Sequence, residues 1–211
     1  MTENTPTEDS DSSVPPPAVP DGRLADGWEL SDRSVETLFE LRQASVRGHT
    51  LVYEDRPLRA TVREATDGRL DQPFRFFFAT RLTFSPPLPP GVGTAMVLPM
   101  VTSQARSAFV EDLRDRGFES IDRGRTEQVR TESGERASLQ KISASFSLPV
   151  VDRELPIEGW VGVWAAGDVR VAGGAYPATS LADLFDGDDD LLARSPATYR
   201  NELLELIRAV G

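Results

Sequence analysis

The side chains that could carry out chemistry begin with a single histidine, His49. A serine nucleophile needs a base, which is usually histidine, and no Gly-x-Ser-x-Gly elbow accompanies His49. The chain contains no cysteine, which excludes a cysteine nucleophile, a disulfide scaffold and cysteine-ligated zinc or iron–sulfur sites. Mechanisms that need two histidines are excluded as well. We expect His49 to be a structural residue at the start of a strand, and we predict no catalytic residue.

One acidic loop near the C-terminus resembles a metal-binding loop. Asp186, Asp188 and Asp190 alternate as the first three ligands of a calcium loop do. The position that requires glycine is Leu191, and the position that requires glutamate is Ala197. The calcium motif therefore fails. We predict a solvated acidic loop and no metal site.

Two glycine pairs could suggest a phosphate-binding loop. Gly91 and Gly93 lack the third glycine and the lysine of such loops, and no suitable strand-to-helix turn is expected there. Gly173 and Gly174 follow a strand pattern, but no helical pattern comes directly after them. Both pairs are predicted to be turns or close-packing sites, and no cofactor is predicted.

Carboxylates and aromatic rings are the other candidates. With 34 acidic residues, the sequence does not single out a pair for general acid–base catalysis. A set of large aromatic residues could line a pocket, although core packing explains it better. The set consists of Trp28, Phe76, Phe78, Trp160 and Trp164.

Charge limits the partners and the compartment. The 34 acidic residues outnumber 23 basic ones, which gives a net charge of −11, and Lys141 is the one lysine among 22 arginines. This charge repels nucleic acid and anionic membranes, and the longest apolar stretch, residues 92–101, is short and contains Pro99. No secretory signal pattern opens the chain. We expect a cytoplasmic protein, and the acidic, lysine-poor composition favours a halophilic source.

The 211 residues fit a single domain preceded by a tail. Residues 1–22 contain five prolines and five acidic residues but no basic residue and almost no bulky apolar residue, so we predict a disordered acidic tail. Residues 23–211 form the predicted domain. We expect deletion of the tail to change the melting temperature little.

Most of the domain has strand patterns. Residues 35–46 fit a strand or a helix, with strand preferred, and a strand is predicted over 49–54. Alternation then predicts a strand over 58–63 and a long strand over 74–84, the latter followed by a proline-rich connector at 85–91. Further strands are expected at 123–131, which is polar and exposed, at 137–148, where a change of phase indicates a bulge, and in a hairpin of 160–166 with 169–176 that is apolar on both faces.

Two helices complete the pattern. The first spans about 103–116, with Ser103 as its cap and Gly117 as its terminator. The second begins at Ser195 and Pro196, which have the preferred order of cap and first-turn proline. The predicted fold is α+β: a mostly antiparallel sheet of six to eight strands, flanked by helices.

The hairpin of 160–166 with 169–176, followed by a C-terminal helix over 195–210, resembles the last part of the PsbP-like fold. This resemblance implies a layered sandwich and a non-catalytic binding or assembly factor, and it transfers no functional residue. As a whole the chain also resembles proteins of salt-loving archaea, which implies no activity.

Two functional hypotheses follow. The first is a non-catalytic binding or assembly-type domain that contacts another protein. The alternative is a hydrolase or isomerase that works with carboxylates, with or without a metal. The alternative requires two carboxylates that converge in a cleft and have raised pKa values. The oligomeric state is not predicted.

Overall fold

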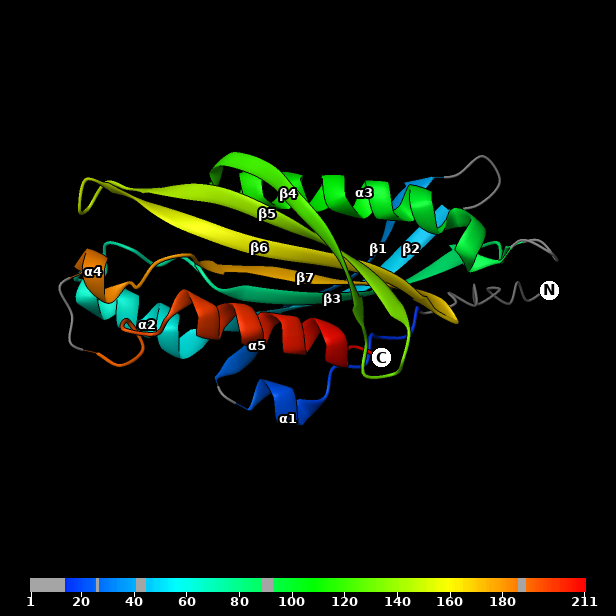
Figure 1. Cartoon of the computed structure of the whole chain (residues 1–211), viewed down its shortest axis with the longest axis horizontal. Helices are drawn as coiled ribbons and strands as arrows, with labels where there is room; N and C mark the ends of the chain where they lie inside the picture. Colours follow the sequence, from blue (N-terminus) through cyan, green and yellow to red (C-terminus); the bar gives the residue numbers. More distant parts are fainter. Residues whose placement is uncertain (1–13, 26, 41–44, 89–92, 186–188) are drawn as a thin grey trace, which may run out of the picture.

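The computed structural model describes residues 14–25, 27–40, 45–88, 93–185 and 189–211. These residues form an antiparallel sheet of seven strands in the order β1-β2-β3-β7-β6-β5-β4, shown in Figure 1. This architecture confirms the α+β prediction. The strands are β1 (Trp28–Glu40), β2 (Ser45–Asp55), β3 (Phe76–Ser85), β4 (Glu119–Arg130), β5 (Arg136–Leu148), β6 (Arg153–Ala166) and β7 (Asp168–Pro177).

Helices cover both faces of the sheet and make three layers. Figure 1 shows α3 on one side and α1, α2 and α5 on the other. The packing agrees, because Gly159 of β6 faces Phe109 of α3, whereas Gly162 on the opposite face of the same strand lies against Ile207 of α5. The helices are α1 (Asp21–Leu24), α2 (Arg56–Ala65), α3 (Thr94–Asp115), α4 (Ala182–Phe185) and α5 (Pro196–Ala209).

The hairpin of β6 and β7 lies within the sheet, as its two-sided apolar pattern predicts. Close packing there depends on glycine. A Cβ atom on Gly174 would lie 2.1 Å from the carbonyl oxygen of Phe76, and one on Gly173 would lie 2.5 Å from that of Trp160. Gly173 and Gly174 are therefore close-packing sites, as expected.

The strand predicted over 58–63 is wrong, because α2 occupies this segment. The carboxylate of Asp55 caps the helix by accepting a hydrogen bond from the backbone N–H of Leu58 at 3.0 Å, and Pro57 lies in the first turn. Leu58 and Val62, four residues apart, are the buried positions. Leu58 and Val62 fit both the alternation of a strand and the spacing of one helix face, and the cap at Asp55 favours the helix.

Helix α3 begins nine residues before the predicted start. Gly93 is its N-cap, so Ser103 lies inside the helix rather than at its end, and the helix continues through Pro99. Proline removes one backbone hydrogen bond in a helix interior, which is why the pattern before Ser103 did not indicate a helix. The predicted end is confirmed: Gly117 has a φ of 85° and Phe118 N–H bonds back to the carbonyl of Leu113.

The bulge predicted in β5 is also wrong. The pairing of β5 with β6 is continuous, whereas the pairing of β4 with β5 has two register shifts, between Glu119 and Asp122 and between Arg123 and Thr126. At both places the extra residue is in β4. The two apolar phases of β5 have another cause. Leu139 faces the α5 side and Ile142 the α3 side, and both side chains are buried because helices cover both faces.

The remaining strand and helix predictions agree with the structure. Segment 35–40 is strand within β1, and the polar strand predicted at 123–131 is the edge strand β4. Ser195 caps α5 by accepting a hydrogen bond from Thr198 N–H. Residues 89–92 of the proline-rich connector lie outside the described residues.

The chain before α1 differs from the tail prediction. Val14 is 3% exposed, and Ala18 and Gly211 exchange two backbone hydrogen bonds of 3.2 and 2.9 Å. Residues 14–20, here called the N-terminal strap, therefore pack on the body. A few small apolar side chains suffice because the strap pairs with the C-terminus. Residues 1–13 of the predicted tail lie outside the described residues.

Candidate functional site

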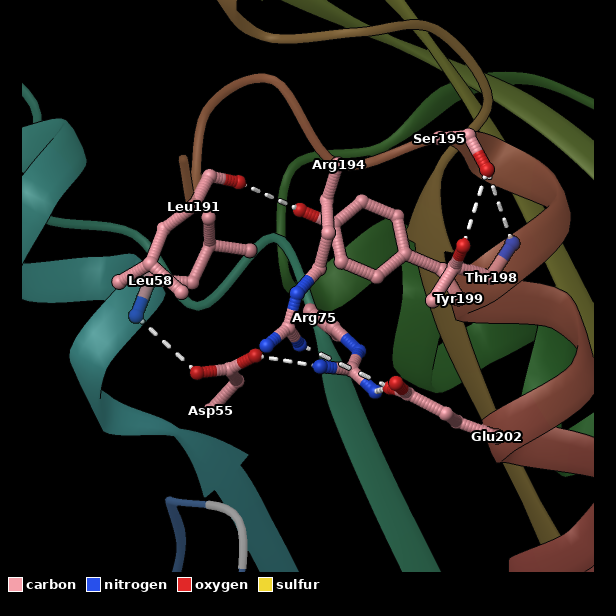
Figure 2. A network of polar contacts seen from close by, with 9 residues as sticks. All are labelled: Asp55, Leu58, Arg75, Leu191, Arg194, Ser195, Thr198, Tyr199 and Glu202. Atoms are coloured by element: carbon pink, nitrogen blue, oxygen red, sulfur yellow. Dashed lines mark hydrogen bonds and ion pairs between the residues drawn. The ribbon is translucent and has the colours of Figure 1, made fainter. Parts of the chain in front are cut away.

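A buried ion-pair cluster joins the end of β2 and helix α5 to Arg75, which directly precedes β3 and is 2–3% exposed. Its guanidinium donates to the carboxylate of Asp55 at 2.5 Å and to that of Glu202, as Figure 2 shows. The rings of Trp28 and Tyr199 lie 4.5 and 4.8 Å from the same guanidinium. Both carboxylates are bound to one arginine, so this cluster holds elements together and offers no free acid or base.

A polar cleft of about 730 Å³ lies between β1 and α2. Arg59 spans it and donates to Glu54 at 2.7 Å and to Asp71 at 2.6 Å, while Arg56 pairs with Glu29 at 2.7 Å. The hydrogen bond from Arg59 lowers the pKa of Asp71. Five of the charged side chains that line this cleft are thus paired with one another, and its character is polar rather than apolar.

An apolar groove of about 350 Å³ runs between α3 and the sheet half that contains β1, β2, β3 and β7, and it is here called the α3 groove. Its apolar character comes from strand residues that face α3 and from the helix side that faces them. The apolar lining residues are Leu38, Phe39, Val52, Phe78, Leu82, Val101, Ala105, Ala108, Phe109 and Val171.

Polar and charged residues also line the α3 groove, and several of them have partners within the protein: the set is Thr50, Thr80, Gln104, Ser107, Glu111, Asp112 and Arg116. The hydroxyls of Thr50 and Thr80 hydrogen-bond to each other at 2.9 Å. Toward one end, Arg116 pairs with Asp112 at 2.9 Å and lies 4.2 Å from the ring of Phe76. A mostly apolar concave surface with a small number of polar groups is typical of binding sites. The α3 groove is therefore the candidate functional site.

The residues considered from the sequence are dispersed rather than brought together. His49 is 8% exposed and its Nδ1–H donates to the carbonyl of Val14 at 2.8 Å, which is a structural role. Trp160 and Trp164 are buried in the core. Of the aromatic set, Phe78 is the one that lines the α3 groove. The alternation of the strand predicts which sheet face Phe78 is on, but not that α3 leaves part of that face uncovered.

The acidic loop is only partly described. Asp186 and Asp188 lie outside the described residues, so the predicted absence of a metal site there stays a prediction. Asp189 accepts a hydrogen bond from Leu191 N–H at 2.8 Å. Gly91 is also outside the described part, and Gly93 directly precedes α3, which the sequence did not indicate.

The carboxyl groups with shifted pKa values do not match the carboxylate-catalysis hypothesis. Hydrogen bonds from Ser133 and Thr131 lower the pKa of Glu135, and that of Asp71 is lowered as well. A general acid at neutral pH needs the opposite shift.

The fold and the groove define a class: a three-layer α+β domain with an apolar groove under one helix. A family model described as a domain of unknown function (DUF6517) matches residues 16–211, so the chain belongs to this family. No curated protein matches the chain. Across the part of the chain that the structure describes, no helix combines the length and the apolar character needed to cross a membrane.

Proposed function

We propose that this protein is a non-catalytic binding domain whose α3 groove holds an extended segment of another protein. The observation that carries the proposal is the groove itself, because it is apolar, open and bordered by the edge strand β1. Leu38 of β1 lines the groove and is 43% exposed. A partner that covers this side chain removes apolar surface from water.

Strand β1 supports a protein partner rather than a small molecule. It has 13 residues and forms one edge of the sheet, so the backbone groups on its outer side are not part of the sheet. An extended segment can add to such an edge through main-chain hydrogen bonds while alternate side chains enter neighbouring pockets. The groove lies next to this edge and would take those side chains.

Charge specifies the chemistry of the partner segment. Strand β1 contains four acidic residues, Glu29, Asp32, Glu36 and Glu40, against the single basic residue Arg33. A segment that alternates basic with apolar residues would complement both the strand and the groove.

The wider context belongs to the same proposal. The hairpin of β6 and β7 with α5 supports a relation to the PsbP-like fold, whose resemblance implies binding or assembly. The excess of acidic residues and the single lysine support a halophilic source and a cytoplasmic location.

Site-specific photo-cross-linking tests the proposal. Benzoylphenylalanine at position 38 is expected to cross-link, in cells of the source organism, to a protein segment rich in apolar and basic residues. Ala108→Trp fills the groove from its exposed rim and is expected to abolish the cross-link. The cross-linked peptide is identified by mass spectrometry.

Two controls accompany this experiment. The same cross-linker at Leu30, exposed on β1 but bordering the polar cleft, is expected not to capture that segment. Ala65→Trp on the exposed end of α2 is expected to leave the cross-link at position 38 unchanged. A cross-link that survives Ala108→Trp, or the extraction of a small apolar molecule in place of a peptide, contradicts the proposal.

A further inference from the structure

Two arginines lie close together on the side of α3 that faces β4 and β5. Arg106 of α3 donates from Nη2 to the hydroxyl of Ser138 in β5 at 3.0 Å. Arg123 of β4 donates from Nη2 to the hydroxyl of Ser107 in α3 at 3.2 Å. The register places Arg123 opposite Ile142, on the sheet face that α3 covers. These two residues are here called the arginine pair.

The arginine pair has no acidic partner in the described residues. Many described arginines pair with a carboxylate, as Arg59 and Arg75 do. Within the described residues, Arg106 and Arg123 have no carboxylate oxygen within 4.0 Å, and the same is true of some exposed arginines such as Arg114. In a chain of net charge −11, acidic side chains are abundant. Two neighbouring cations without an acidic partner, one of them partly buried, indicate a place for an anion from outside the chain.

Burial raises the free-energy cost of leaving Arg106 without a negatively charged partner. Arg106 is partly buried, and its Nε–H is inaccessible to solvent and has no hydrogen-bond partner. Burial first, and repulsion by Arg123 second, lower the pKa of Arg106. Arg123 is exposed, so a bound anion between the two guanidiniums would above all compensate the partly buried charge of Arg106.

The hydroxyls beside the arginine pair extend the donor set. Ser107 and Ser138 each accept a hydrogen bond from an arginine, so each keeps its own O–H to donate. Two guanidiniums and two hydroxyls supply donors for more than two oxygens, which suits a tetrahedral phosphate better than a planar carboxylate. Nucleic acid does not fit, because the net charge repels a long polyanion.

We propose that Arg106 and Arg123, with Ser107 and Ser138, form a binding site for a single phosphate group, either free phosphate or the phosphoryl group of a small ligand. Ser107 also lines the α3 groove, but Arg106, Arg123 and Ser138 do not, so the site lies beside the groove and takes a ligand of different chemistry. It does not depend on the proposed function.

Titration with inorganic phosphate, followed by NMR of the full chain at constant ionic strength set with KCl, tests the site. The backbone amides of Ser107 and Ser138 are expected to shift and to saturate. Arg106→Gln and Arg123→Gln are each expected to weaken the affinity at least tenfold. Phosphoserine in a second titration distinguishes a phosphoryl group from free phosphate.

Arg114→Gln is the matched control, because Arg114 is an exposed arginine of the same helix. This substitution is expected to leave the affinity for phosphate unchanged. Preserved dispersion of the amide signals shows that each variant is folded. Shifts that grow linearly without saturation, or an equal loss in Arg114→Gln, overturn the site. Acetate that binds as tightly as phosphate overturns the assignment to phosphate.

Discussion

Arg75 is a buried arginine that pairs with two carboxylates. These two partners come from distant parts of the chain. Asp55 also caps α2, and Glu202 belongs to α5. Removal of one member of a buried pair leaves the other charge uncompensated, which costs far more than the pair itself contributes. Stability at this point of the molecule therefore depends on one guanidinium.

We predict that Arg75→Met lowers the free energy of unfolding by about 3–5 kcal/mol, because Asp55 is then buried without its cation. Arg56→Met is the control, since the pair of Arg56 with Glu29 is exposed and is expected to contribute about 0–1 kcal/mol. Chemical denaturation in concentrated KCl measures both variants. Equal losses in the two would show that Asp55 is not held in the way the geometry indicates.

Tyr199 gives the protein an alkaline limit. Its ring is fully buried, its hydroxyl donates to the carbonyl of Leu191 at 3.0 Å, and burial raises its pKa from 10.0 to about 12. Between these two pH values the unfolded chain has lost the phenolic proton while the folded chain keeps it. Stability contributed by the neutral phenol is therefore present below pH 10 and lost as the pH rises toward 12.

We predict that the free energy of unfolding falls steadily above pH 10 and that Tyr199→Phe has a shallower fall. The variant loses one hydrogen bond, which costs about 1 kcal/mol at neutral pH, so the two curves are expected to approach each other as the pH rises. Urea denaturation between pH 8 and 11.5 measures the difference. Parallel curves would contradict a raised pKa at this residue.

At the scale of elements, the N-terminal strap changes the expected effect of truncation. Val14 is buried over His49, and Ala18 pairs with the C-terminal Gly211. We predict that deletion of residues 1–20 lowers the melting temperature by several degrees, because it exposes this surface and removes those hydrogen bonds.

Deletion of residues 1–13 is the control for the strap. These residues are polar apart from Met1 and Pro6, and we expect their removal to change the melting temperature by no more than about a degree or two, as their composition indicates. Thermal unfolding followed by circular dichroism compares the two deletions. An equal melting temperature for both would mean that the strap contributes no stability.

The elements that the sequence predicts well are those with one strong local signal. The hairpin of β6 and β7 has apolar residues on both faces, and α5 begins with a serine cap and a proline. Helix α2 was missed because Leu58 and Val62 fit both periods, and the start of α3 was missed because Pro99 lies inside it. These cases depend on tertiary packing, which overrides local propensity.

The α3 groove was beyond prediction for a related reason. Its residues come from β1, β2, β3, β7 and α3, and their convergence depends on the sheet order. Strand patterns identified the apolar faces of these strands but not the place where α3 leaves one of those faces uncovered. The arginine pair likewise joins residues of α3 and β4 that no spacing in the sequence relates.

At the scale of the whole molecule, two electrostatic effects respond to salt in opposite directions. With a net charge of −11, repulsion between acidic side chains destabilises the folded state. Without the five acidic residues of 1–22, the rest of the chain still carries a net charge of −6. Salt screens this repulsion. Salt also screens the attractive pairs, such as Arg56 with Glu29 and Arg23 with Glu132, but these are exposed and contribute about 0–1 kcal/mol each.

We predict that the screening of repulsion outweighs the screening of attractive pairs, so that the free energy of unfolding rises from dilute buffer to molar KCl. The screening length falls from about 30 Å at 0.01 M to about 3 Å at 1 M, so repulsion across the surface is removed, whereas the buried pair of Arg75 with Asp55 is shielded from the ions. Screening alone saturates by a few tenths molar, and binding of hydrated cations by carboxylates continues beyond it. Urea midpoints measured from 0.01 to 3 M KCl separate the two stages.

The triple variant Asp32→Asn, Glu36→Gln and Glu40→Gln on β1 removes three acidic charges. It is expected to reduce the salt dependence of stability at low salt while leaving the rise above 1 M nearly intact. A midpoint that stays flat over the whole range would contradict a salt-adapted protein and would leave the negative charge as a determinant of solubility.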